Sequence, residues 1–298
     1  MPSRAVEPAR ARGGSRARRT LVALGRFARR KPMGAIGAVI VIALLVMAVF
    51  AERIAPYGYD DTVRGARMKA PSARHYLGTD NLSRDIWSRV VYGARVSVTV
   101  GVLTVSLAVF LATAIGVSSG YFGGAYDLVL QRVVDAWLSF PYLVIILSVM
   151  AVLGPGLLNV VISLSVIIAA VNARVIRGAT ISVIHSTYVE AARAVGAGHR
   201  RIILRHVLPN VSATIIILAT IGLGTAILAE SALSFLGFGV PPPYPSWGGM
   251  LSGSGRTYML RAPWMAIWPG VAISLAVFGF NMLGDALRDV LDPRLRGS

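Results

Sequence analysis

Six long apolar runs constrain this chain more strongly than any other feature. A bilayer core of about 30 Å needs about 20 apolar residues in a helix. Six stretches approach or reach that length: Met33–Phe50, Val96–Ser118, Val133–Leu153, Leu157–Val171, Val211–Ala232 and Trp264–Leu283. The fourth is short, so we expect its helix to begin or end inside protein. Only residues 154–156 separate the third from the fourth, which predicts a helical hairpin. The chain is therefore expected to be an all-α polytopic membrane protein with about six transmembrane helices.

The composition supports a membrane protein and excludes other classes. Hydrophobic residues make up 55% of the chain and charged residues 14%, whereas soluble domains carry about 25% charged residues. The net charge is +17, but the basic residues cluster between the apolar runs, which favours a lipid bilayer over nucleic acid as the partner. The chain has no cysteine, so disulfides and thiolate metal sites are excluded. Its four histidines are scattered, and their spacing predicts no metal site.

The N-terminal segment predicts a basic tail followed by a retained helix. Residues 1–31 hold nine arginines and one lysine. The apolar run after them exceeds the core of a signal peptide, which is about 7–15 residues. We therefore expect the first transmembrane helix at residues 33–51. Residues 1–32 are expected to be a disordered cytoplasmic tail, because they hold little that a core could bury.

The basic residues between the runs predict the orientation and the remaining boundaries. With the N-terminus inside, the inner segments hold 20 lysines and arginines and the outer segments hold 10, as the positive-inside rule requires. Both termini are then cytoplasmic. The sequence predicts an extracytoplasmic loop at 52–95, a transmembrane core at 96–284 that includes a cytoplasmic loop at 172–210, and a cytoplasmic tail at 285–298.

The outer loop at 52–95 has a helical pattern in its second half. Asp80 is a suitable helix cap, and Leu82, Ile86 and Val90 recur at helical spacing. The pattern predicts a short amphipathic helix on the outer membrane surface.

The inner loop at 172–210 predicts two helices joined by a sharp turn. Thr187 and Glu190 have the spacing of a capping box, so the first helix should begin there. Gly196 and Gly198 can adopt positive φ and end it. A second helix should cover roughly 199–207 and end before Pro209, because the residue before a proline avoids the α region.

The motifs of this loop resemble the EAA loop of ABC importer permeases. Glu190, Ala191 and Ala192 are followed by Gly196 and then by Leu208-Pro209. His206 stands where many members have an aliphatic residue. The resemblance implies a coupling helix that docks on an ATPase subunit. It assigns this role to Glu190, Ala191, Ala192, Arg193, Gly196 and Pro209.

Other motifs resemble the C-type permease of dipeptide, oligopeptide and nickel importers, over about residues 33–296. They lie at 75–80, 83–85, 92–95, 230–237, 245–248, 281–285 and 291–294, with Ser83 where glycine is usual. The resemblance implies a type I ABC importer transmembrane domain in the bacterial cytoplasmic membrane. It implies as partners a second homologous permease, ATP-binding subunits and an extracytoplasmic binding protein. Peptides are the expected cargo, with nickel or another small solute as the alternative.

The chain is not expected to be an enzyme. A P-loop needs a lysine after glycine, and the only lysines are Lys31 before proline and Lys69 before alanine. We therefore expect no cofactor in this chain, with ATP and Mg²⁺ bound by the partner ATPase. Residues 116–120 match the nucleophile-elbow pattern, but they lie at the end of an apolar helix and follow no strand, which such a site requires.

Two polar residues within the apolar runs are candidates for the solute pathway or its gate. These are Glu230 and Asn172, since polar groups inside membrane spans are costly and often functional. A stand-alone secondary transporter is the rival class, but the sequence has no convincing internal repeat.

Overall fold

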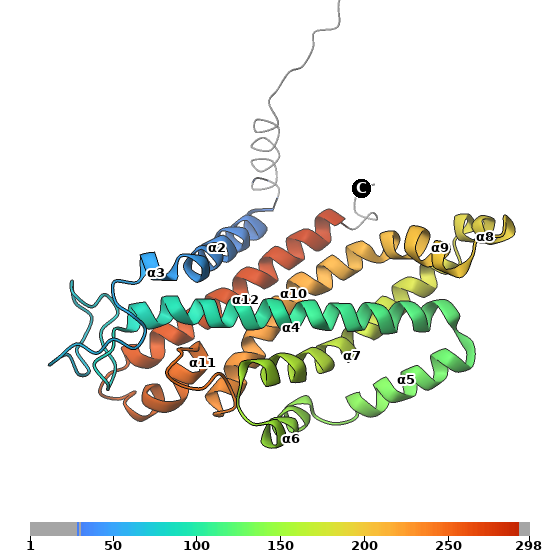
Figure 1. The fold of residues 1–298 in the computed structure, drawn as a ribbon. Helices are drawn as coiled ribbons and strands as arrows, with labels where there is room; N and C mark the ends of the chain where they lie inside the picture. Colours follow the sequence, from blue (N-terminus) through green and yellow to red (C-terminus); the bar gives the residue numbers. More distant parts are fainter. Residues whose placement is uncertain (1–28, 30, 292–298) are drawn as a thin grey trace, which may run out of the picture.

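The computed structural model describes Arg29 and residues 31–291, so most of the tail predicted at 1–32 and the end of the tail predicted at 285–298 lie outside the described residues. Within this part of the chain every regular element is a helix (Figure 1). The helices are α2 Pro32–Val49, α3 Ala51–Ile54, α4 Ile86–Phe122, α5 Gly124–Leu138, α6 Tyr142–Leu153, α7 Leu157–Ile184, α8 Thr187–Ala194, α9 His199–Ile202, α10 Leu208–Phe235, α11 Trp247–Met250 and α12 Trp264–Leu291, with π-helical turns at η1 Ile203–Val207 and η2 Leu251–Gly255.

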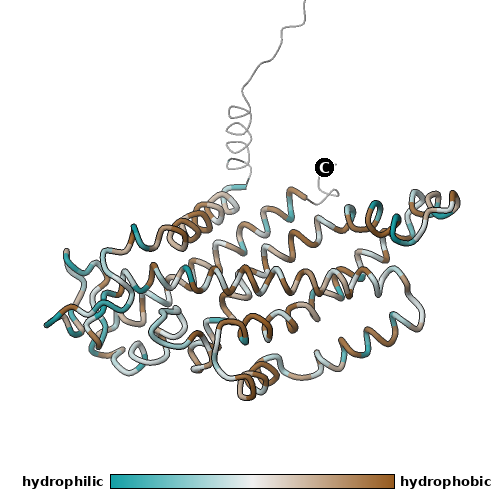
Figure 2. The backbone as a smooth tube through the Cα atoms, viewed as in Figure 1, coloured by the Kyte–Doolittle hydropathy of each residue, from teal (hydrophilic) through white to brown (hydrophobic). Residues whose placement is uncertain are grey.

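The long helices confirm the prediction of about six spans. Five helical segments of the described chain are long and apolar enough to cross a membrane, and the bent pair α5–α6 makes a sixth. Hydrophobic residues follow these helices, whereas polar residues gather in the loop between α3 and α4 (Figure 2). That loop and α8 lie at opposite ends of the molecule (Figure 1). This layout is what a bilayer requires, because backbone groups in hydrocarbon must bond within their own helix.

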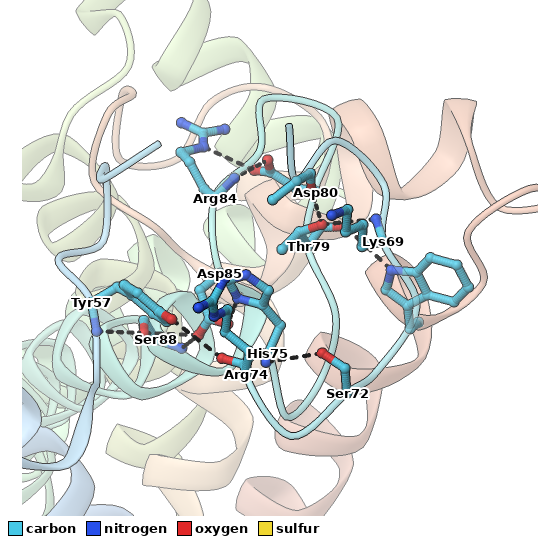
Figure 3. Close-up of polar contacts among 12 residues, drawn as sticks. Tyr57, Lys69, Ser72, Arg74, His75, Thr79, Asp80, Arg84, Asp85 and Ser88 are labelled. Atoms are coloured by element: carbon cyan, nitrogen blue, oxygen red, sulfur yellow. Dashed lines mark hydrogen bonds and ion pairs between the residues drawn. The ribbon is translucent and has the colours of Figure 1, made fainter. Parts of the chain in front are cut away.

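Helix α4 begins inside the predicted outer loop, so the prediction of a separate surface helix after Asp80 is wrong. Asp85 caps α4, because its carboxylate accepts a hydrogen bond from the Ser88 backbone N–H at 2.8 Å (Figure 3). The other carboxylate oxygen lies 2.9 Å from Nδ1 of the His75 ring. Asp80 instead folds a turn ahead of α4, where its carboxylate accepts the backbone N–H groups of Leu82 and Arg84. The helix therefore runs without a break from this loop through the membrane.

The third predicted span is broken rather than straight. Helices α5 and α6 meet at 84° across residues 139–141. Pro141 lacks a backbone N–H and its ring excludes the preceding turn, which ends α5. The Ser139 hydroxyl bonds back to the Asp135 carbonyl at 2.8 Å and satisfies one of the free acceptors. The hairpin predicted between α6 and α7 is present, since only residues 154–156 separate them.

Two helices continue further than predicted. Helix α7 reaches Ile184, thirteen residues past the predicted end of its apolar run at Val171, because its later turns pack on α4. Pro209 does not end the second helix of the inner loop, since α9, η1 and α10 form one continuous span. In the wider π turn at 203–207 the Leu208 N–H donates to the Ile203 carbonyl. The helix therefore continues past Pro209, although this residue has no N–H to donate.

Close packing of α4 against α7 depends on glycine. A Cβ at Gly116 would lie 2.6 Å from the Ala173 carbonyl oxygen, and one at Gly120 would lie 2.9 Å from the Arg177 carbonyl oxygen. Small residues at this spacing allow two membrane helices to bring their backbones together. This contact fixes α7, and with it the start of the segment that carries α8.

We expect Gly116→Ala to destabilise the fold, because even one methyl group overlaps the backbone of α7. Overpacking of this kind costs about 1–3 kcal/mol. Gly178→Ala is the matched control, since nothing lies within 4 Å of a Cβ there. It should be neutral or stabilising. Thermal unfolding in one detergent compares the two, and equal midpoints would contradict the packing described here.

Candidate coupling helix and translocation site

Helix α8 begins at the predicted residue but by a different contact. Its first helical residue is Thr187, and Ser186 occupies the cap position without a side-chain cap bond. The capping box predicted between Thr187 and Glu190 is therefore wrong. The Ser186 hydroxyl instead donates to the Val183 carbonyl at 2.6 Å, at the end of α7. This leaves the Glu190 carboxylate free of the helix start.

Gly196 ends α8 as predicted, with φ of +79°. The Gly196 N–H bonds the Arg193 carbonyl at 2.9 Å, and the Ala197 N–H bonds the Ala192 carbonyl at 3.0 Å. These two bonds form a Schellman motif, which turns the chain sharply after the helix. The prediction of positive φ for Gly198 is wrong, since its φ is −68°. A single glycine therefore shapes the turn between α8 and α9.

The inner side of α8 is fixed to the bundle at the end of α4. Val189 is fully buried in an apolar cluster that α4, α7 and α10 share. The Arg193 guanidinium lies over the Tyr121 ring, 5.7 Å from its centroid. The Tyr121 hydroxyl is in turn 2.8 Å from Nδ1 of His199, at the start of α9. Tyr121 thus joins α4, α8 and α9, and no sequence pattern predicts this because the contacting residues lie far apart along the chain.

The outer side of α8 is free in this subunit and mostly small or apolar. Tyr188 is 43% exposed and Val195 84% exposed. Ala191 and Ala194 are exposed between them, beside Glu190. The Glu190 side chain has neither a hydrogen bond nor an ion pair with any residue that the structure describes. Glu190 and these four residues therefore form one exposed surface. Ala192 is half-buried, Arg193 faces Tyr121, and Pro209 lies apart on the first turn of α10.

Two ion pairs join α5 to α7, although their arginines were expected only to add positive charge to the inner loop. Arg177 Nε donates to the Asp127 carboxylate at 2.6 Å, and the Ser119 hydroxyl also donates to this carboxylate. Arg174 pairs with Asp135 one level further along, where both side chains are about half exposed. The pairs hold α5 against α7, and separations of 39 and 50 residues leave no local signal for them.

Asn172 borders a cavity of about 560 Å³. The cavity lies between the break that joins α5 to α6 and the facing sides of α7 and α10. Its wall is mostly apolar, with Tyr142, Asn172 and Thr225 as the side chains that carry polar groups. Irregular backbone at membrane depth is tolerated where it lines such a space. We call it the inner cavity.

Glu230 is fully buried and is not part of the lining of the inner cavity. The Ser234 hydroxyl donates to its carboxylate at 2.6 Å, and the hydroxyls of Ser231 and Ser97 lie at 3.4 and 3.5 Å. Its neighbour Ala229 borders the inner cavity, whereas Ser234 borders a second cavity toward the α3–α4 loop. Glu230 therefore lies in the wall between two cavities.

Comparison with known proteins gives two family matches. Residues 112–297 match the family described as binding-protein-dependent transport system inner membrane component. Residues 23–71 match the N-terminal transmembrane domain of oligopeptide transport permease C.

Curated relatives match over nearly the whole chain. The chain is 40% identical to the dipeptide transport system permease protein DppC of Alkalihalophilus pseudofirmus, over 90% of this chain and 88% of that protein. It is 41% identical to the glutathione transport system permease protein GsiD of Escherichia coli O6:K15:H31, over 90% of this chain and 89% of that one.

The fold is also similar to a solved structure. A chain of the MetNI methionine ABC transporter in an inward-facing conformation matches with a TM-score of 0.56 and 19% identity, covering 70% of this chain and 97% of that chain. At this identity the match concerns the fold alone.

We expect Gly196→Ala to loosen α8, because a side chain in the left-handed region costs about 1–2 kcal/mol. Amide hydrogen exchange in α8 should accelerate about tenfold, since local opening follows local stability. Gly198→Ala is the control, because its backbone is ordinary and nothing lies within 4 Å of a Cβ there. Equal exchange in the two variants would show that the turn does not depend on positive φ.

Proposed function

The chain belongs to the family of binding-protein-dependent transport system inner membrane components, and we propose that it forms one half of a peptide pathway driven by ATPase subunits on separate chains. It is thus a multi-pass permease of the ABC importer type rather than an enzyme. The second half of the pathway comes from a homologous permease, and an extracytoplasmic binding protein delivers the solute. ATP and Mg²⁺ bind to the partner subunits.

Two findings support peptides as the cargo. The two relatives compared here are named for a dipeptide and for glutathione, which is itself a tripeptide. The N-terminal match is to the oligopeptide permease domain. Peptides are therefore the substrate class that we propose.

The coupling role of α8 rests on one observation: its inner side is fixed to the bundle while its outer side is free. Val189 and Arg193 hold the helix on α4, and Glu190 stands without a partner among the residues described. A groove on an ATPase subunit can accept the small side chains of Ala191 and Ala194 closely. We infer that closure of the ATPase dimer moves α8, and that the end of α4, which Arg193 contacts through Tyr121, moves with it as one body.

The pathway runs along α7 and α10 in this proposal. The inner cavity beside Asn172 opens where α5 breaks from α6. Glu230 closes the pathway above it in the present arrangement, through its bonds to Ser97 and Ser234. Parting of α4 from α10 would separate Ser97 from Glu230 and join the two cavities.

The proposed orientation places α8 and both termini in the cytoplasm of a bacterium. Helix α2 runs toward the α3–α4 loop and α12 runs away from it (Figure 1). Lys31 before α2 pairs with Asp289 near the end of α12 at 2.5 Å. The start of α2 and the end of α12 therefore lie together, on the side where α8 and the arginines of α9 lie. An excess of arginine on this side agrees with the positive-inside rule.

We expect Glu190→Ala to reduce peptide uptake and binding-protein-stimulated ATP hydrolysis together. Loss of one charge-assisted contact costs about 1.5–3 kcal/mol, which is on the order of tenfold or more. The assembled complex in proteoliposomes, with its binding protein and a dipeptide, is the sample for both rates. Glu52→Ala is the control, because Glu52 is also exposed but lies on α3 and pairs with Arg95. If the Glu190 variant keeps both wild-type rates, α8 does not couple through this residue.

The absence of cysteine allows the orientation to be measured with single substitutions. In intact protoplasts, a membrane-impermeant maleimide should label Leu260→Cys, whose position is fully exposed in the loop before α12. Ser298→Cys should react only after the membrane is permeabilised. The reverse pattern would invert the proposed topology.

A further inference from the structure

A second cavity, which we call the outer cavity, has a volume of about 440 Å³. It lies between the segment that leads into α4, the α6–α7 turn, the end of α10 and the loop that carries α11. Ligand pockets have volumes of about 300–1,000 Å³, so a molecule the size of a dipeptide fits this space.

Charged side chains form one wall of the outer cavity. Its only charged lining residues are Asp80, Arg84 and Arg89. Arg84 Nε donates to the Asp80 carboxylate at 2.8 Å, and Figure 3 shows this pair ahead of α4. Arg89 is 9% exposed, and its Nε lies 3.9 Å from the same carboxylate. Asp60, outside the lining, also accepts from Arg84 Nη1 at 3.0 Å, so Arg84 is paired twice and Arg89 is the less closely paired guanidinium at this wall.

Hydrogen-bonding capacity remains unused at this wall. Arg89 Nη1 donates to the Tyr59 carbonyl at 2.9 Å, whereas its Nη2 has no partner within residues 31–291. The buried Oδ1 of Asn81 likewise has no partner in the described chain. A buried polar group without a partner costs about 1–3 kcal/mol. The wall therefore offers one charged donor and one neutral acceptor to a ligand.

We propose that the outer cavity binds the carboxylate end of a peptide. Arg89 would donate to the terminal carboxylate, and Asn81 Oδ1 would accept the N–H of the preceding amide. A peptide C-terminus carries both groups next to each other, which a metal ion or a sugar does not. The proposal rests on the peptide cargo proposed above and specifies where this chain first contacts it.

The position of the outer cavity suits a site of entry. Ser234 lines the cavity and also donates to Glu230 at 2.6 Å. On the far side of Glu230, Ala229 borders the inner cavity. A peptide held at Arg89 thus waits next to the wall that separates the two cavities, and the exposed α3–α4 loop end of the bundle gives access to it.

The test measures binding of radiolabelled L-alanyl-L-alanine to the full permease–ATPase complex in lipid nanodiscs, without the binding protein. We expect Arg89→Gln to weaken binding about tenfold or more, as loss of a charged hydrogen bond predicts. Asn81→Asp adds a negative charge at nearly constant size and should also weaken it. Arg95→Gln is the matched control, since Arg95 lies on the same helix but pairs with Glu52 outside the cavity. Dialanine amide, which lacks the carboxylate, should bind wild type more weakly and bind Arg89→Gln as it binds wild type.

Equal binding of dialanine to wild type, Arg89→Gln and Asn81→Asp would overturn the proposal. It would also fall if the substitutions change only the affinity for the binding protein, since the cavity would then be a docking site for that protein. Both variants must first assemble with the ATPase subunits and keep basal ATP hydrolysis. If dialanine binds through Arg89 but no peptide is taken up with ATP, the proposed function fails and the site stands. If uptake keeps its wild-type KM in both variants, the site fails and the function stands.

Discussion

Backbone amides and carbonyls within hydrocarbon must find partners in the chain itself, and the architecture follows from this constraint. The described chain meets it with long helices and interrupts them at few places. The break between α5 and α6 borders the inner cavity rather than lipid. The π turn before Pro209 keeps α9 and α10 continuous although proline has no N–H. A continuous α10 matters for function, because it connects the segment after α8 with Glu230 and the outer cavity.

The sequence predicted the elements that local chemistry controls. Apolar runs placed the spans, residues 154–156 predicted a turn, and Gly196 predicted the end of α8. The errors arose where distant contacts or backbone adjustments decide the structure. Asp80 and Asp85 are equivalent caps by residue type, and only the His75 and Ser88 contacts select Asp85. Pro209 predicts a helix end by its covalent geometry, but a π turn removes the conflict.

The candidate sites show the same division. Gly196 is visible in the sequence because a glycine turn is a local feature, and Glu190 because it begins the motif that resembles the EAA loop. The Tyr121 contacts that hold α8, and the pair Asp127–Arg177, join residues separated by about fifty positions or more. No periodicity predicts such contacts, because they arise only when α4, α5 and α7 pack together. The cavities are products of that packing as well, so Asn172 was predicted by its polarity and not by its surroundings.

The proposed coupling role requires that α8 moves as one body with the end of α4. Spin labels at Val195, directly after α8, and at Phe122, at the end of α4, test this most directly, because both positions are exposed. The labelled complex must retain peptide uptake. Double electron–electron resonance then compares the distance between the labels in the nucleotide-free and ATP-bound complex. The account predicts the same distance distribution in both states. A distribution that shifts or broadens on ATP binding would contradict it, because α8 would then move without the helices that line the pathway.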